Sequence, residues 1–105
     1  MTDIKTLNDA FRQSLQGGRV MLTAGIKAKT QDEIAEILEK VRSFDNFTTA
    51  NDPYGEHDFG SLDYKGQKIF FKIDYYDLNY EYMSENPADP TITNQVLIIM
   101  LASEY

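Results

Sequence analysis

Residues 51–64, Asn-Asp-Pro-Tyr-Gly-Glu-His-Asp-Phe-Gly-Ser-Leu-Asp-Tyr, join a tight turn to the first strand of a predicted hairpin. Proline and glycine within the turn supply the backbone dihedral angles that a sharp bend requires. The stretch also contains the only histidine of the chain, His57, between Glu56 and Asp58. It therefore organises both the predicted sheet and the strongest candidate for a polar site.

Two predicted strands, 58–64 and 68–76, flank Lys65-Gly66, a dipeptide that favours a tight turn because glycine accepts a positive φ. Alternation of side chains in the second strand predicts one buried face and one outer face. A third strand is considered at 80–83. The buried face is predicted to carry Ile69, Phe71, Ile73 and Tyr75, and the outer face Phe70, Lys72, Asp74 and Tyr76.

Before this hairpin, helical periodicity marks residues 3–16, where apolar residues recur every three or four positions. Asp3 is the predicted N-cap of this helix. The glycine pair at 17–18 is the predicted stop signal, because glycine accepts the left-handed conformation that ends many helices. A short strand is predicted at 19–23.

A second helix is predicted over residues 30–41, where Thr30 and Glu33 have the spacing of a capping box. A last helix is predicted from Asp89-Pro90 to about residue 104, with aspartate as N-cap and proline at the first helical position. Residues 96–101 are apolar on every side, and their β-branched content leaves a strand as the alternative.

The chain of 105 residues has the length of one domain, and this order of elements predicts a single α+β domain over residues 1–105. In this domain an antiparallel sheet with a central hairpin is packed by about three helices. The predicted core consists of Ile34, Ile37, Leu38, Ile69, Phe71, Ile73, Val96 and Met100.

The formal net charge is −7, from 17 acidic and 10 basic residues, which disfavours direct binding to nucleic acid. Cysteine is absent, so no disulfide forms, and a reducing cytoplasm fits. The sequence has neither an apolar run long enough to span a membrane nor a signal pattern. We expect a cytoplasmic protein, monomeric or a small homo-oligomer, without membrane contact, metal or cofactor.

The polar residues of the opening stretch, Asn51 and Asp52 with the histidine and its flanking carboxylates, allow three interpretations. The first is a structural turn, because Asn and Asp side chains cap turns. The second is a partner-binding surface. The third is a metal or catalytic site, because histidine beside carboxylates binds cations or transfers protons. This last interpretation uses His57, Glu56, Asp58 and Asp74, although their spacing matches no established metal motif.

A second cluster combines acidic residues with tyrosines at the end of the predicted hairpin. Tyrosine provides a large contact area and a polar tip, and it is enriched at protein interfaces. An acidic, tyrosine-rich edge would imitate the charge of nucleic acid, whereas the simpler interpretation is that the tyrosines cover a sheet face. The predicted binding residues are Asp74, Tyr76, Asp77, Tyr80, Glu81 and Glu85.

Several segments resemble a small bacterial family of unknown function. They include Asn-Asp-Pro-Tyr-Gly-Glu-His-Asp-Phe-Gly at 51–60, Lys-Ile-Asp-Tyr-Tyr-Asp at 72–77 and Met-Leu-Ala-Ser-Glu-Tyr at 100–105. The resemblance covers nearly the whole chain, and at Phe70-Phe71 the chain departs from the tryptophan expected before the lysine. It implies residence on plasmids, phages and other mobile elements, and it implies no assigned reaction or cofactor.

Small acidic proteins of mobile elements often inhibit host defence, and their targets carry basic channels for nucleic acid. We therefore expect a binding protein with an anti-CRISPR or anti-restriction role, whose partner is a protein with a basic nucleic-acid-binding surface. This inference is by association and not from chemistry. The alternatives are a small metal-dependent hydrolase that uses the His57 cluster, and a housekeeping interaction module.

Overall fold

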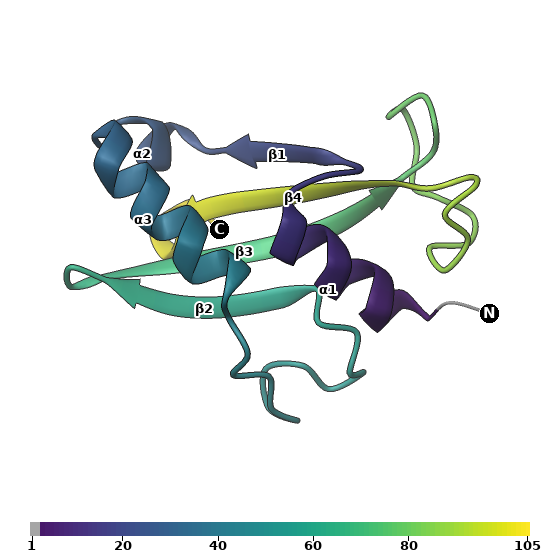
Figure 1. Cartoon of the computed structure of the whole chain (residues 1–105), viewed down its shortest axis with the longest axis horizontal. Helices are drawn as coiled ribbons and strands as arrows, with labels where there is room; N and C mark the ends of the chain where they lie inside the picture. The colour runs from purple at the N-terminus through teal and green to yellow at the C-terminus, as the bar shows by residue number, and fades with distance from the viewer. Residues whose placement is uncertain (1–2) are drawn as a thin grey trace.

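The computed structural model describes residues 3–105 (Figure 1). Helix formers, capping residues and alternating apolar residues place the elements close to their predicted ranges in the first three quarters of the chain. In chain order the elements are α1 (Ile4–Ser14), β1 (Arg19–Leu22), α2 (Ala24–Lys27), α3 (Gln31–Arg42), β2 (Phe59–Tyr64), β3 (Gln67–Tyr76), β4 (Asn94–Leu101) and the short 3₁₀ helix η1 (Ala102–Glu104).

The four strands form one sheet in the order β1-β4-β3-β2. β3 runs antiparallel to both of its neighbours, and β1 pairs with β4 in parallel. The α+β class and the hairpin are confirmed, and Lys65 and Gly66 both have positive φ, 48° and 82°, as a tight turn requires. The sheet is mixed and not wholly antiparallel, and the hairpin has one inner strand and one edge strand.

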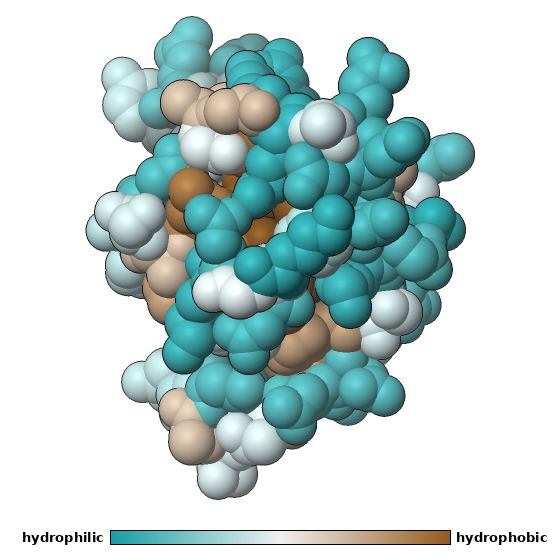
Figure 2. All heavy atoms as spheres, turned by 90° about the vertical axis from the view of Figure 1, so that its left-hand side faces the viewer, coloured by the Kyte–Doolittle hydropathy of each residue, from teal (hydrophilic) through white to brown (hydrophobic). Residues whose placement is uncertain are grey.

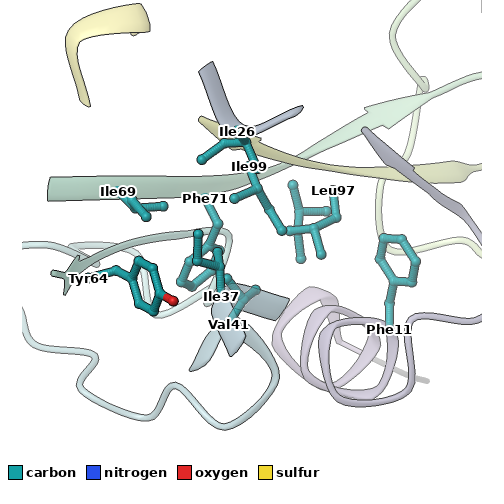
Figure 3. Close-up of a cluster of buried hydrophobic side chains, with 10 residues drawn as sticks. Phe11, Ile26, Ile37, Val41, Tyr64, Ile69, Phe71, Leu97 and Ile99 are labelled. Carbon is teal, nitrogen blue, oxygen red and sulfur yellow. The ribbon is translucent and has the colours of Figure 1, made fainter. Parts of the chain in front are cut away.

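All three α-helices contribute to one core on the same face of the sheet; in Figure 1, α1 and α3 cross over the strands and α2 lies beside the end of β1. Figure 3 shows the side chains that meet there, from the helices and from three strands. The predicted stripe of α3 is confirmed, with Ile37 and Val41 fully buried, and so is the buried face of β3. The cluster consists of Phe11, Ile26, Ile37, Val41, Tyr64, Ile69, Phe71, Ile73, Leu97 and Ile99.

Two predicted core residues, Val96 and Met100, are buried but lie on the other face of the sheet. In β4 they alternate with Leu97 and Ile99, which face the helices. The predicted last helix is therefore wrong, and the strand alternative is correct. A strand flanked by β1 and β3 buries side chains on both faces, which explains the uninterrupted apolar run.

Further corrections concern element ends. No strand forms over residues 80–83, where Met83 makes a single bridge with Tyr76. Asp3 caps α1 by accepting from the Thr6 backbone amide, as predicted, but the helix ends at Ser14, with Leu15 as its C-cap, and not at the glycine pair. Leu15 itself takes the left-handed conformation, with φ 59°. The capping box at Thr30 is confirmed.

Gly60 in β2 leaves the space that the Phe71 ring occupies. A β-carbon at this position would lie 2.3 Å from the Phe71 ring and 2.9 Å from the Phe44 ring. We predict that Gly60→Ala lowers the free energy of unfolding by about 1–3 kcal/mol, because overpacking moves both rings. Urea denaturation measures this loss, with Ser61→Ala as the control. Equal stability of the two variants would contradict the packing.

Candidate functional site

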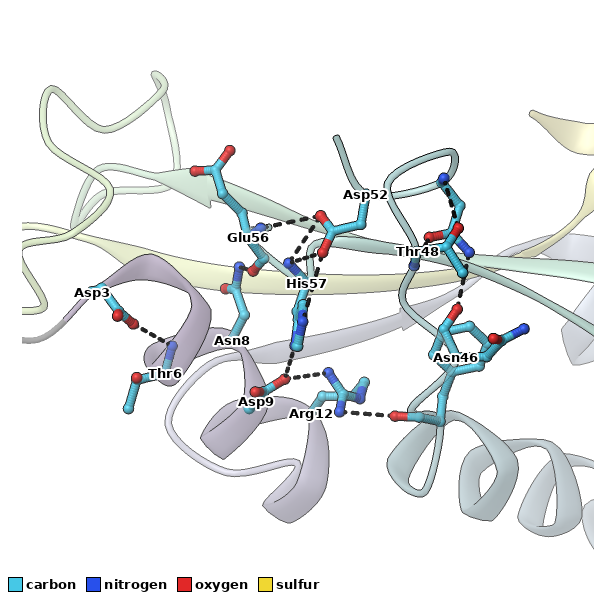
Figure 4. A network of polar contacts seen from close by, with 12 residues as sticks. Asp3, Thr6, Asn8, Asp9, Arg12, Asn46, Thr48, Asp52, Glu56 and His57 are labelled. Carbon is cyan, nitrogen blue, oxygen red and sulfur yellow. Dashed lines mark hydrogen bonds and ion pairs between the residues drawn. The ribbon is translucent and has the colours of Figure 1, made fainter. Parts of the chain in front are cut away.

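His57 lies in the loop between α3 and β2, where residues from α1 and from its own loop surround it (Figure 4). Its backbone is in the left-handed region, with φ 58°, and its ring stacks on Phe47 at a centroid distance of 3.8 Å. Nδ1 lies 2.9 Å from Asp9 Oδ1, and Nε2 lies 3.6 Å from Asp52 Oδ2. Both ring nitrogens therefore face a carboxylate.

The loop that carries His57 is shaped by the turn residues that the sequence indicates. The Asp52 carboxylate accepts from the backbone amides of Glu56, at 3.1 Å, and of His57, at 3.3 Å. Asn51 Oδ1 accepts from the Thr48 amide, 2.8 Å away. These bonds support the interpretation of the opening stretch as a structural turn.

Asp9 also pairs with a buried cation, Arg12, one helical turn away. The guanidinium is 2 % exposed and lies 2.9 Å from Asp9 Oδ1. It donates to the Phe44 carbonyl at 3.1 Å and lies 5.1 Å from the centre of the Phe47 ring. Within the described part of the chain, residues 3–105, the Arg12 Nε has no hydrogen-bond partner. One carboxylate of α1 thus joins the histidine and the arginine to the loop after α3.

Asn8, also on α1, is fully buried and makes the second connection. Its amide nitrogen donates to the Glu56 carbonyl and to the Tyr75 hydroxyl, each at 2.9 Å, and its oxygen accepts from Gln95 at 2.7 Å. Burial and the neighbouring carboxylate of Asp58 raise the pKa of Tyr75, whose hydroxyl donates to that carboxylate.

Asn8, Asp9 and Arg12 were not among the residues that the sequence predicted for the polar site. The signal was present, because Asn8 and Arg12 lie beside the apolar stripe of the first helix, at positions that face the core. A buried polar side chain needs a partner inside the protein. The partners of Asn8 were not identifiable from local pattern, because Glu56, Tyr75 and Gln95 are 48, 67 and 87 positions away, and Asp9 is likewise 48 positions from His57.

The proposed catalytic set does not converge. His57 faces Asp9 and Asp52, whereas Asp58 accepts from Tyr75, and Asp74 lies on the opposite face of the sheet, 3.2 Å from Lys72. Burial, and then the carboxylates of Asp58 and Asp52, raise the pKa of Glu56. Among residues 3–105, no group of three or more His, Asp or Glu side chains is placed to hold a metal ion.

The His57 ring borders a cleft of about 270 Å³, and Arg42 and Asp45 also line this cleft. One face of the His57 ring is covered by Phe47, and its two nitrogens lie near the carboxylates of Asp9 and Asp52. The ring is thus held in place by its neighbours, and we call this group of residues the His57 clamp; it consists of His57, Asp9, Asp52, Arg12 and Phe47.

The predicted acidic surface is divided among different environments. Asp74 and Tyr76 lie on the sheet face without helices, and Arg19 lies 3.7 Å above the Tyr80 ring. Asp77 Oδ1 accepts from the amides of residues 79 and 81, so it caps the turn after β3. Glu81 and Glu85 are exposed to solvent.

Large apolar side chains are exposed on the loop between β3 and β4. Leu78, Tyr82 and Met83 are exposed by 56 %, 73 % and 60 %. We call residues 77–93, between β3 and β4, the acidic loop. It contains four carboxylates and neither lysine nor arginine. The loop thus combines exposed apolar area with one sign of charge.

The fold and these two sites define a small α+β domain, with helices on one face of a mixed sheet and an acidic loop at one end. The chain belongs to the family described as "protein of unknown function (DUF3768)", whose match covers residues 22–104. The helix α1, which supplies Asp9 and Arg12 of the His57 clamp, lies before the matched region. Searches of curated proteins and of solved structures found no match. No helix within residues 3–105 is long and apolar enough to cross a membrane.

Proposed function

We propose that this protein is a non-enzymatic inhibitor that covers the basic nucleic-acid-binding surface of a host defence complex, in an anti-CRISPR or anti-restriction role. The observation that carries the proposal is the composition of the acidic loop. Exposed Leu78, Tyr82 and Met83 stand beside the exposed carboxylates Glu81 and Glu85. Apolar anchors within a rim of charge are typical of protein interfaces.

The charge distribution along the chain supports a basic partner. Residues 73–105 include six acidic residues and no lysine or arginine, whereas all ten basic residues lie before them. An acidic surface steers association with a basic one and repels nucleic acid. Arg19, on strand β1, lies over the Tyr80 ring and so places a positive charge beside this part of the acidic loop. We therefore place the contact on the outer part of the loop, at Glu81 and Glu85.

The role in host defence is supported by context. The sequence resembles bacterial proteins of plasmids and phages, where inhibitors of CRISPR effectors and restriction enzymes occur. These targets handle nucleic acid and carry the basic surfaces that the acidic loop would complement. The hydrolase alternative depends on His57, whose Nδ1 lies 2.9 Å from Asp9 Oδ1 and whose Nε2 lies 3.6 Å from Asp52 Oδ2.

We predict that the double variant Glu81→Lys/Glu85→Lys associates with its target at least ten times more slowly at low salt, because complementary charge accelerates encounter. The reversal of two carboxylates changes the net charge from −7 to −3. At high salt the difference from the parent should shrink, because ions screen exposed charges. Association rates are measured against immobilised CRISPR effector complexes and restriction enzymes.

Asp77 is left unchanged in this experiment, because its side chain caps the turn. The matched control is Glu39→Lys/Asp45→Lys, which produces the same charge change on exposed residues outside the loop. Both variants should keep the parental stability within about 0.5 kcal/mol per substitution. If both double variants associated equally slowly, net charge and not the position of Glu81 and Glu85 would explain the effect. A parent that binds none of these complexes would contradict the proposal.

A further inference from the structure

A groove of about 510 Å³ lies between the start of α1, the turn before β2 and the acidic loop. Its volume falls within the range of about 300–1,000 Å³ that is typical of ligand pockets. Because Ala88 belongs to the acidic loop, the groove adjoins the surface that we propose for target binding. We call it the Tyr54 groove; its lining includes Asp3, Ile4, Lys5, Tyr54, Glu56 and Ala88.

Tyr54 supplies an aromatic wall of this groove, and its side chain is 86 % exposed. The face of a tyrosine ring attracts a cation. Two other aromatic rings of the chain already have one, since Arg12 lies 5.1 Å from the centre of the Phe47 ring and Arg19 lies over the Tyr80 ring. Among residues 3–105, no lysine or arginine lies over the ring of Tyr54. This ring is therefore available to a cation from outside the chain.

Glu56 places a carboxylate in the same groove. Its backbone is fixed, because its amide donates to Asp52 and its carbonyl accepts from Asn8. In Figure 4 the carboxylate points away from both of these partners. Within residues 3–105 it makes no ion pair. Burial, and then the carboxylates of Asp58 and Asp52, raise its pKa, so a cation beside Glu56 would offset this repulsion.

The lysine of the groove, Lys5, acts on a different carboxylate. Hydrogen bonds from Thr6, and then the charge of Lys5, lower the pKa of Asp3, whereas Lys5 is not among the charges that act on Glu56. The opposite end of the molecule, which faces the viewer in Figure 2, is mostly hydrophilic. There Lys65 of the hairpin turn lies 3.5 Å from the Glu33 carboxylate. Glu56 thus keeps a negative charge that the neighbouring lysine does not compensate.

We propose that the Tyr54 groove receives an arginine side chain from the basic surface of the target, an inference that rests on the proposed function. A planar guanidinium can stack on the Tyr54 ring and donate two parallel hydrogen bonds to the Glu56 carboxylate, whereas the ammonium of lysine is a point charge. The chain itself contains this combination in the His57 clamp. There Arg12 pairs with Asp9 and lies over the Phe47 ring. The groove supplies the ring and the carboxylate, and the target supplies the cation.

The test is a titration of the ¹⁵N-labelled protein with N-acetyl-arginine amide at low salt, followed by NMR and without any target present. The backbone amide signals of Gly55 and Glu56 should shift saturably, with a dissociation constant of about 10 mM or below, as suits a ligand of this size. N-acetyl-citrulline amide has nearly the same shape without the charge and should shift neither signal. N-acetyl-lysine amide should bind at least about three times more weakly, because it cannot pair and stack at once.

Two variants locate the bound arginine. Glu56→Gln should raise the dissociation constant at least about tenfold, because a hydrogen bond to a charged group is lost. Tyr54→Leu should raise it at least about threefold, because the ring face is lost while an apolar side chain stays. The matched control is Asp63→Asn, which removes one carboxylate at an exposed position near the end of β2 and should change the constant by less than about twofold. The amide spectrum of each variant shows whether the fold is kept.

Three results would overturn the proposal: no saturable shift at Gly55 and Glu56 up to about 100 mM probe, equal binding of the arginine probe and either of the other two probes, or equal effects of Glu56→Gln and Asp63→Asn. Because no target is present, this outcome is separate from that of the defence role. If the probe binds the groove and no defence complex binds the protein, the proposed function fails and the arginine site stands. If a defence complex binds and the probe does not, the reverse holds.

Discussion

Replacement of Phe71 by alanine is expected to lower the free energy of unfolding by about 3–5 kcal/mol, as is usual for a buried aromatic side chain. The Phe71 ring is fully buried and meets Phe44 edge to face at a centroid distance of 5.1 Å. It also fills the space above Gly60. Because small domains are stable by only about 5–15 kcal/mol, this variant should show a large shift of its urea midpoint.

The neighbouring phenylalanine is the matched control. Phe70 points to the sheet face opposite the helices, where it contacts Phe59 and Tyr105 and remains partly accessible. Phe70→Ala should therefore cost about half as much or less, because less apolar area leaves the protein interior. If both substitutions cost the same, the two faces of β3 would not differ in burial, and the assignment of the core to the helix side would be wrong.

The hairpin was predictable because local signals agree on it. Alternation in 68–76 and a glycine at the turn predict the same register, and Ile69 and Ile73 are buried as expected. β4 was ambiguous, since an apolar run without periodicity fits a buried helix or a buried strand. Only its pairing with β1 and β3, at distant positions in the chain, distinguishes the two.

The polar site was predictable in part for the same reason. The turn-capping roles of Asn51 and Asp52 depend on residues a few positions away. The contact of His57 with Asp9 depends on how α1 packs, and local pattern contains no information on that. Asp74 shows the opposite failure: its strand was predicted correctly, but alternation places it on the face away from the histidine.

The second large effect is expected at Asp9. Among residues 3–105, Asp9 is the only carboxylate paired with the buried Arg12, and alanine at this position removes it and leaves His57 Nδ1 without this partner. Breaking a buried ion pair usually costs about 3–5 kcal/mol, because a charge stays in the interior without compensation. The Asp9 side chain is 29 % exposed, so in the variant water can solvate part of the charge that loses its partner. We therefore expect a loss of about 2–3 kcal/mol in urea denaturation.

A double variant separates this cause from a general loss of packing. In Asp9→Ala/Arg12→Met the buried charge is absent, and the double variant should be at least about 1 kcal/mol more stable than Asp9→Ala alone. Asp45→Ala, which alters an exposed carboxylate at the border of the same cleft, should change stability by less than about 0.5 kcal/mol. If the double variant were less stable than Asp9→Ala, Arg12 would contribute through packing on Phe47 and its bond to the Phe44 carbonyl. The clamp would then be held by these contacts and not by the ion pair.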